Sequence, residues 1–296
     1  MVKLAGLGTP AKINLFLRIT GKRANGYHEL DSVFVPISLF DLVTVEMRAT
    51  SSKSVSLRTG CQEIPVDDRN LAVRAARKFL EEFHVKAAVT VELNKQIPIG
   101  AGLGGGSSDA AAVLRLMASL SRVEEPRRLA SLALTIGADL PFFLDPRPAH
   151  VRGVGELIEP LTRIPVMHLL IGIPPLQVST TEVFRSLERS EWSGPASESD
   201  ISLLERGLVS AALLVNDLTG PASRKHPEIE KLKRLLEKSG ARATAMSGSG
   251  GGVFGVFNDS LQAQLARTEA SRIMPEARFL CASSPAVSVD SQKERQ

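Results

Sequence analysis

The sequence predicts a protein of mixed helices and strands. Two local patterns indicate this class: residues 11–19 alternate apolar and polar side chains as a strand does, and residues 70–83 repeat apolar side chains at helical spacing. The chain has 296 residues, which is enough for one large domain or two. A Gly-Val-Gly segment at 153–155 precedes an apolar strand, so we place a domain boundary near 155–165.

The first half begins with the strand at 11–19, whose alternation puts Lys12 and Asn14 on one face. An Asn-Gly pair within 21–27 then predicts a turn. Apolar segments predict further strands at 30–39, 41–48, 53–58 and 85–93, and helical spacing predicts helices at 70–83 and 126–136.

The second half alternates short strands with amphipathic helices. We expect strands at 166–173, 242–246, 253–257 and 276–282, helices at 180–188, 201–212, 227–239 and 260–272, and a loop at 190–200. The polar tail 286–296 is expected to be disordered.

Composition excludes several classes of protein. The net charge of +4 is small for this length and the basic residues are scattered, so no nucleic acid partner is expected. The five histidines show no ligand spacing, and no apolar run is long enough to span a membrane. Cys61 and Cys281 lie far apart, and no signal peptide pattern is present, so we expect two free thiols in a cytoplasmic protein.

The most informative segment is PIGAGLGGGSS at 98–108, followed by an alanine-rich run. Glycine lets a ligand approach the backbone, and a helix start supplies free N–H groups and the positive end of the helix dipole. The segment therefore predicts an anion site, most simply for a nucleotide phosphate. We expect Ser107 or Ser108 to be the N-cap of the helix, with Asp109 in its first turn.

Three other interpretations of this loop stay open on the residues alone. A dinucleotide-binding turn needs an acidic residue at the end of a second strand, but Glu125 is followed by Pro126. A Walker A loop needs a lysine where Gly106 stands. The third interpretation is a glycine turn without function, but so many glycines would lower the stability of the fold without a compensating role.

The segment PIGAGLGGGSSDAA resembles the phosphate loop of the GHMP kinase superfamily. AKINL at 11–15 and SGSG at 247–250 agree with that superfamily. Residues 12–28 (KINLFLRITGKRANGYH) and 137–143 (GADLPFF) are similar to the branch that phosphorylates 4-diphosphocytidyl-2-C-methyl-D-erythritol. The similarity extends over roughly residues 8–282.

The resemblance implies an α+β fold in two domains with the active site in the cleft between them. Residues 1–158 would form an N-terminal ATP-binding domain like domain 2 of ribosomal protein S5, and residues 159–285 a ferredoxin-like C-terminal domain. It further implies ATP-dependent phosphorylation of the 2-hydroxyl of the cytidyl substrate, with Mg²⁺ held by phosphate oxygens and no protein ligand that we can name. Such a kinase would act as a monomer or weak homodimer, with no membrane partner.

The resemblance assigns the catalytic roles to Asp139 and Lys12. A carboxylate within reach of an alcohol can accept its proton, and a nearby ammonium keeps that carboxylate ionised. Without the resemblance, Asp139 is equally well an N-cap for a helix at Leu140, and Lys12 a solvated lysine.

Binding residues follow from the same resemblance. Those proposed for ATP are Pro98, Ile99, Gly100, Ala101, Gly102, Leu103, Gly104, Gly105, Gly106, Ser107 and Ser108, with Asn70 and Lys95 near the adenine. Those proposed for the cytidyl substrate are Asn14, Tyr27, His28, Thr180 and Phe184, because a pyrimidine needs hydrogen bonds at its edge and a flat partner for its face. The alternative for the aromatic residues is ordinary packing.

Two rival functions remain: a superfamily kinase acting on homoserine, mevalonate or a sugar, and a nucleotide-binding protein without catalysis. The first gives no reason for the cytosine-directed set, and the second predicts a missing base. The second glycine loop departs from its relatives, which often carry a bulkier residue where GGV stands at 251–253. The segment 216–218 (NDL) is expected to be structural support.

Overall fold

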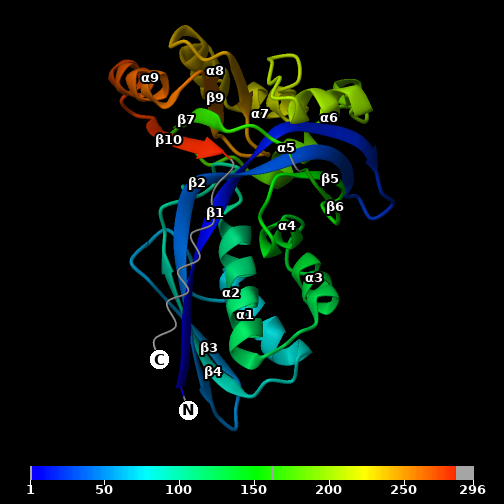
Figure 1. The fold of residues 1–296 in the computed structure, drawn as a ribbon, viewed down its shortest axis with the longest axis vertical. Helices are drawn as coiled ribbons and strands as arrows, with labels where there is room; N and C mark the ends of the chain where they lie inside the picture. The colour runs from blue at the N-terminus through cyan, green and yellow to red at the C-terminus, as the bar shows by residue number, and fades with distance from the viewer. Residues whose placement is uncertain (1, 162, 285–296) are drawn as a thin grey trace.

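The computed structural model describes residues 2–161 and 163–284 of the chain. The molecule is elongated, with one sheet running along much of its length and a second sheet at the upper end (Figure 1). The expected tail at 286–296 lies outside the described residues.

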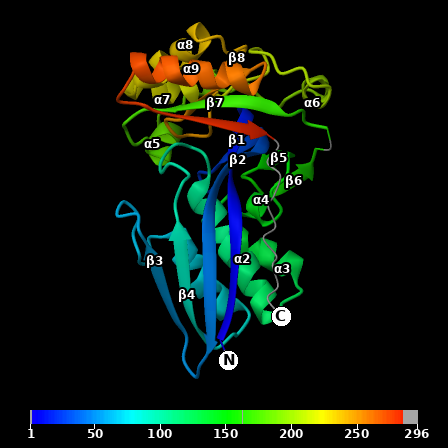
Figure 2. The ribbon, with the colours of Figure 1, turned by 60° about the vertical axis from the view of Figure 1, so that its left-hand side comes forward.

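The first sheet is built on a long antiparallel pair, β1 (Val2–Lys22) and β2 (His28–Ala49). These two strands run side by side along most of the molecule (Figure 2). The other members are β3 (Ser54–Thr59), β4 (Ala87–Asn94), β5 (Ala149–Gly153) and β6 (Leu157–Pro160), in the order β3-β4-β2-β5-β6 with β1 paired to β2.

Helices cover one face of this sheet. They are α1 (Leu71–Glu82), α2 (Gly105–Ser121), α3 (Pro126–Leu134) and α4 (Leu140–Leu144). The alanines Ala110, Ala111 and Ala112 of α2 are fully buried. Their small side chains let α2 pack closely between the sheet and its neighbouring helices, which fixes the position of its N-terminus.

The second sheet has the order β10-β7-β9-β8 and is antiparallel. Its strands are β7 (Met167–Ile173), β8 (Ala243–Met246), β9 (Val253–Phe257) and β10 (Arg278–Ser284). The remaining elements are α5 (Thr180–Arg185), the 3₁₀ turn η1 (Arg189–Glu191), α6 (Glu198–Glu205), α7 (Thr219–Lys225), α8 (Glu228–Lys238) and α9 (Ser260–Ile273).

Strand β1 joins the two halves of the molecule. Leu17 donates its N–H to the carbonyl of Val215 and accepts from the N–H of Asp217, at 2.8 and 2.9 Å. The Asp217 carboxylate accepts from the N–H of Ile19 at 2.7 Å and from the N–H of Ser193 at 2.9 Å. The structural role expected for residues 216–218 is therefore confirmed, and the middle of β1 lies at the junction of the halves.

Most predicted elements are present. The strand predicted at 11–19 is longer, extending over Val2–Lys22, and the helix predicted at 180–188 ends at Arg185. Other differences have identifiable reasons. The two strands predicted at 30–39 and 41–48 form the single strand β2. The expected gap between them is a shift in the register of β2 against β1, and the strand continues through it. Helix α6 begins inside the predicted loop, since Ser197 caps it and Asp200 completes a capping box. It ends at Glu205, before Gly207 adopts a left-handed conformation.

The N-cap prediction for α2 is wrong. The helix begins at Gly105, its N-cap is Gly104 with φ +73°, and Ser107 and Ser108 lie inside it. Asp109 is consequently one turn further along than expected. A Cβ atom at Gly104 would lie 2.7 Å from the Phe143 ring, so the space at the cap admits only glycine.

Within residues 2–161 and 163–284, no helix is both long and apolar enough to cross a membrane. The second sheet begins after β6, so the change of sheet falls between Pro160 and Met167. The predicted division at 158/159 falls inside β6, which still pairs with β5 of the first sheet.

Candidate active site

A cavity of about 680 Å³ lies where the two halves meet. Its wall is formed mainly by β1, β2 and the turn between them, the glycine loop before α2, the residues directly before α4, helix α5 and the second glycine loop. Ten of the residues predicted from the sequence line it, namely Lys12, Asn14, Tyr27, His28, Gly102, Gly104, Ser107, Asp139, Thr180 and Phe184.

Lys12 and Asp139 face each other inside this cavity. The Lys12 ammonium lies 3.6 Å from the Asp139 carboxylate and donates a 2.6 Å hydrogen bond to Asn14. Lys12 is buried over the Phe34 ring, and burial lowers its pKa while Asp139 opposes that shift. Asp139 is the N-cap residue of α4, yet its side chain makes no capping bond. Its carboxylate is therefore free of the helix that follows it.

The glycine loop is held against β1 by its backbone. Lys12 donates its N–H to the carbonyl of Leu103 at 2.9 Å, directly before the start of α2. The N-terminal N–H groups of α2 thus sit at the Lys12 end of the cavity, where the helix dipole favours negative charge. Ser107 lines the cavity, whereas Ser108 is buried and its hydroxyl donates to the carbonyl of Pro10 at 2.7 Å.

The second glycine loop, residues 247–252 (SGSGGG), interlocks with the first. A Cβ atom on Gly102 would lie 1.9 Å from the carbonyl oxygen of Ser247. The Ser247 hydroxyl donates to the carbonyl of Gly102 at 3.1 Å, and Gly252 donates its N–H to Ala101 at 3.2 Å. The Asn216 side chain donates to two carbonyls of the second loop region, both at 2.8 Å. The two loops therefore form one backbone-packed unit.

Aromatic rings gather at the opposite side of the cavity. His28 stacks on Phe184 with 5.3 Å between ring centroids, and Trp192 meets the His28 ring edge-on at 5.8 Å. Desolvation, with a smaller contribution from Lys22, lowers the pKa of His28. A neutral imidazole offers one donor and one acceptor. Tyr27 is 63% exposed at the cavity edge, which does not fit the packing alternative.

Two predicted ATP residues have partners inside the protein. Asn70 is the N-cap of α1, accepting from the N–H of Ala72 and donating to the carbonyl of Pro65, both at 2.9 Å. Lys95 is buried and paired with Asp41 and Asp109. Neither side chain lines the cavity, nor do Pro98, Ile99, Gly100, Ala101, Leu103, Gly105, Gly106 and Ser108.

Sequence reasoning missed several cavity residues. Lys22 and Asn25 lie in the turn already recognised at 21–27, and Arg185 follows Phe184 at the end of α5. Ser249 lines the cavity and its hydroxyl is 2.7 Å from that of Thr180. Lys22 and Arg185 could have been found as the basic residues close in sequence to the predicted aromatic residues. Ser249 could not, because its place at the cavity depends on how the second glycine loop folds.

Two family models match the chain. The GHMP kinases N-terminal domain matches residues 70–145, and the GHMP kinases C-terminal domain matches residues 195–276. No group of three or more His, Cys, Asp or Glu side chains that could hold a metal ion occurs in the described part of the chain.

Curated relatives agree with these models. The 4-diphosphocytidyl-2-C-methyl-D-erythritol kinase of Anaeromyxobacter dehalogenans (strain 2CP-C) is 42% identical over 84% of this chain and 79% of its own. The enzyme of that name from Alkaliphilus metalliredigens (strain QYMF) is 36% identical over 94% of this chain and 97% of its own. A crystal structure of 4-(cytidine 5'-diphospho)-2C-methyl-D-erythritol kinase superposes with a TM-score of 0.78 at 34% identity, covering 97% of this chain and all of that one.

Proposed function

Because the chain belongs to the GHMP kinases and, within them, to the 4-diphosphocytidyl-2-C-methyl-D-erythritol kinases, we infer that it transfers a phosphoryl group from ATP to the 2-hydroxyl of that cytidyl substrate. It is an ATP-dependent small-molecule kinase of isoprenoid precursor synthesis.

The Lys12–Asp139 pair is the observation that carries the catalytic proposal. Asp139 has a side chain 32% exposed and not used by α4, so it is placed to accept the hydroxyl proton of the substrate. Lys12, at 3.6 Å, is placed to offset the negative charge that develops on the attacking oxygen. Proton abstraction of this kind typically contributes about 10² to 10⁴ in rate.

The triphosphate is proposed to lie along the glycine loop at residues 98–108. Gly102, Gly104 and Ser107 line the cavity, and the free N–H groups at the start of α2 supply the donors for phosphate oxygens. The other loop residues shape this backbone. Asn70 and Lys95 are proposed to lie near the adenosine end of ATP. Because both side chains are already bonded to other residues of the protein, they are proposed to shape that end of the site.

Mg²⁺ is proposed to arrive with ATP. The donor set fits an ion held mainly by phosphate oxygens, because Asp139 is the single carboxylate among the described residues that line the cavity, and no three-ligand cluster occurs within residues 2–161 and 163–284. Bound there, the ion would neutralise charge on the phosphates during transfer.

The cytidyl substrate is proposed to occupy the aromatic side of the cavity. His28, held neutral by its lowered pKa, offers both a donor and an acceptor to the edge of cytosine. Phe184 and Tyr27 supply flat partners for its face, and Asn14 and Thr180 add polar contacts. Lys22 and Arg185 line the same cavity and bring positive charge to the diphosphate.

The remaining proposals concern the setting of the enzyme. As the resemblance to the GHMP kinases implies, we propose that it functions as a monomer or weak homodimer. Cys61 and Cys281 are free thiols, which suits a reducing cytoplasm. We propose small molecules, and not nucleic acid, as its binding partners.

ADP release by the purified protein tests the function. The cytidyl substrate, homoserine and mevalonate are each supplied with ATP and Mg²⁺, and release is expected with the first alone. Asp139→Asn is expected to lower kcat by about 10² to 10⁴, with its unfolding midpoint measured to confirm that it folds. Release with homoserine but not the cytidyl substrate contradicts the assignment, and undiminished kcat in Asp139→Asn contradicts the base.

A further inference from the structure

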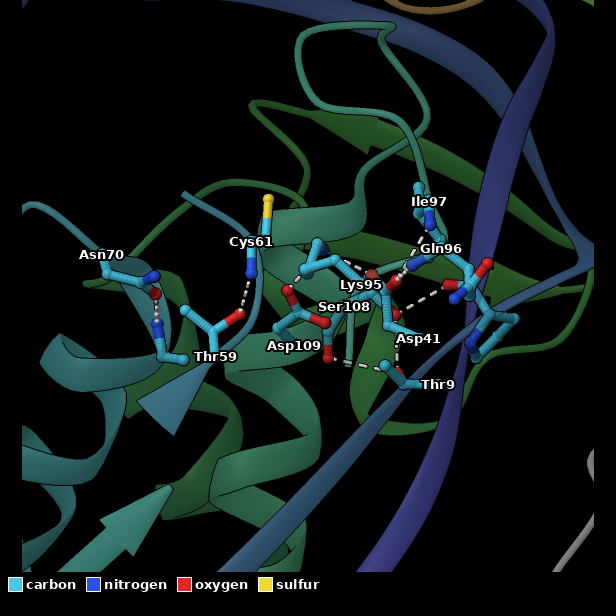
Figure 3. Close-up of polar contacts among 12 residues, drawn as sticks. Thr9, Asp41, Thr59, Cys61, Asn70, Lys95, Gln96, Ile97, Ser108 and Asp109 are labelled. Carbon is cyan, nitrogen blue, oxygen red and sulfur yellow. Dashed lines mark hydrogen bonds and ion pairs between the residues drawn. The ribbon is translucent and has the colours of Figure 1, made fainter. Parts of the chain in front are cut away.

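Three charged side chains are buried together beneath the glycine loop, outside the cavity. Asp41 belongs to β2, Lys95 follows β4, and Asp109 lies within α2. The Lys95 ammonium hydrogen-bonds to Asp41 and, at 2.6 Å, to Asp109 (Figure 3). The side chains are 0%, 7% and 4% exposed for Asp41, Lys95 and Asp109, so all three charges are removed from water.

Asp41 fixes the segment that leads into the loop. One oxygen of its carboxylate accepts from the N–H groups of Gln96 and Ile97, at 2.5 and 2.9 Å, while the other is bonded to Lys95 (Figure 3). Ile97 directly precedes the loop and is buried. These two backbone bonds therefore set the direction in which the chain leaves β4.

Asp109 ties the other end of the loop to the same cation. It lies in α2, four residues after Gly105, the first residue of that helix. A Cβ atom on Gly105 would lie 2.9 Å from the Ile97 side chain and 3.3 Å from the Lys95 ammonium. The Lys95 ammonium is thus packed directly under the helix start whose N–H groups are proposed to bind the triphosphate.

The charge of the cluster is incompletely balanced. One ammonium faces two carboxylates, and the second oxygen of Asp109 is buried without a hydrogen-bond partner. Burial raises the pKa of Asp109 to about 7, with Lys95 opposing and Asp41 reinforcing the shift. The charged groups that face Asp109 are Asp41 from β2 and Lys95 from the segment after β4.

We propose that Asp41, Lys95 and Asp109 are positioning residues that hold the two ends of the phosphate loop at the separation that the triphosphate requires. The cluster acts through the loop backbone and not by lining the cavity. The identity of the ligand as ATP rests on the function proposed above. Loss of the cluster should therefore weaken ATP binding while leaving the affinity for the cytidyl substrate unchanged.

Calorimetric titration of the full chain with ATP and Mg²⁺ tests this, because it needs no acceptor substrate. Lys95→Met leaves the two carboxylates without their cation, and its dissociation constant for ATP is expected to rise at least tenfold. The dissociation constant for the cytidyl substrate should stay within twofold. Asp31→Asn is the matched control: Asp31 is a buried carboxylate of β2 that binds His150 and the N–H of Ala196, away from the loop. It should lose stability without losing affinity for ATP.

A pH series provides the readout that loss of structure would not mimic. As Asp109 ionises, the cluster becomes more negative beneath a polyanion, so the dissociation constant of the wild-type chain for ATP should rise between pH 6 and 8.5 more steeply than that of Asp109→Asn. Parallel pH profiles, or a folded Lys95→Met chain that binds ATP within twofold of the wild type, would overturn the proposal. If Lys95→Met does not fold, the pH comparison decides alone.

The failure of this proposal is distinguishable from failure of the proposed function. A wild-type chain that binds ATP but releases no ADP with the cytidyl substrate contradicts the function and leaves the cluster testable by titration. A wild-type chain that fails to bind ATP contradicts both.

Discussion

Replacing Gly102 by alanine tests whether the two glycine loops form one packed unit. Gly102 has φ +73°, and a Cβ atom there would lie 1.9 Å from the carbonyl oxygen of Ser247 and 2.9 Å from the nitrogen of Gly250. A carbon–oxygen contact needs roughly 3.3 Å, so the two backbones would have to separate by more than about 1 Å. Neither obstacle is a flexible side chain that could turn away.

Gly100 provides a matched comparison. Its φ of +72° is nearly the same, but the nearest atom to an added Cβ is the Gln177 side chain at 3.9 Å. Gly100→Ala therefore carries only the cost of the left-handed backbone, about 1–2 kcal/mol. Gly102→Ala carries that cost plus a steric overlap, typically about 1–3 kcal/mol, for a total of about 2–5 kcal/mol.

Urea denaturation of both variants measures the two losses in the free energy of unfolding. The difference between them, about 1–3 kcal/mol, is the contribution of contact with the second loop. If both variants lose the same free energy, the interlocking of the loops is refuted and only backbone strain remains.

Three further predictions concern the two ends of the cavity and the buried cluster. Phe184→Ala should raise KM for the cytidyl substrate about tenfold without changing KM for ATP, because it removes a ring stacked on His28; equal rises in both KM values would contradict this. Lys12→Met should lower kcat about 10²-fold in a folded chain, since Lys12 is the cation nearest Asp139 at 3.6 Å; a kcat within threefold of wild type would exclude the role. Asp109 keeps its proton up to a pKa of about 7 in the folded chain but loses it near 3.8 when unfolded, so the free energy of unfolding should fall as pH rises from about 4 to about 7. Asp109→Asn should lack that component of the slope, and an identical slope in both proteins would contradict it.

Local patterns were sufficient where the spacing of side chains or a capping residue identifies the element without reference to distant residues. The alternation at 11–19 predicted that Lys12 and Asn14 share a face, and their side chains are hydrogen-bonded at 2.6 Å. Strand β9 and helix α9 also agree closely with the prediction, because their apolar spacing and capping residue are local features.

Tertiary contacts decided the rest. The start of α2 could not be predicted from capping preference, because the space at Gly104 is limited by Phe143, a residue distant in sequence. Lys95 has the sequence features of a solvated lysine at a strand end, and only the fold brings Asp41 and Asp109 to it. Burial of a charge depends on partners that sequence spacing does not reveal.

The unusual second glycine loop has a physical explanation in two parts. A Cβ atom on Gly250 would lie 2.2 Å from the nitrogen of Gly102, and one on Gly252 would lie 2.4 Å from the carbonyl oxygen of Ala101, so both glycines are required by unyielding backbone. At Gly251 the neighbours are instead side chains of the segment 174–178, at 3.2–3.3 Å. Those side chains can shift, and Gly251 does not line the cavity. The size of the residue at position 251 is therefore limited by the side chains at 174–178. A chain with smaller side chains at 174–178 would accept a larger residue at 251, and the contacts of Gly250 and Gly252 with the first loop would be unchanged.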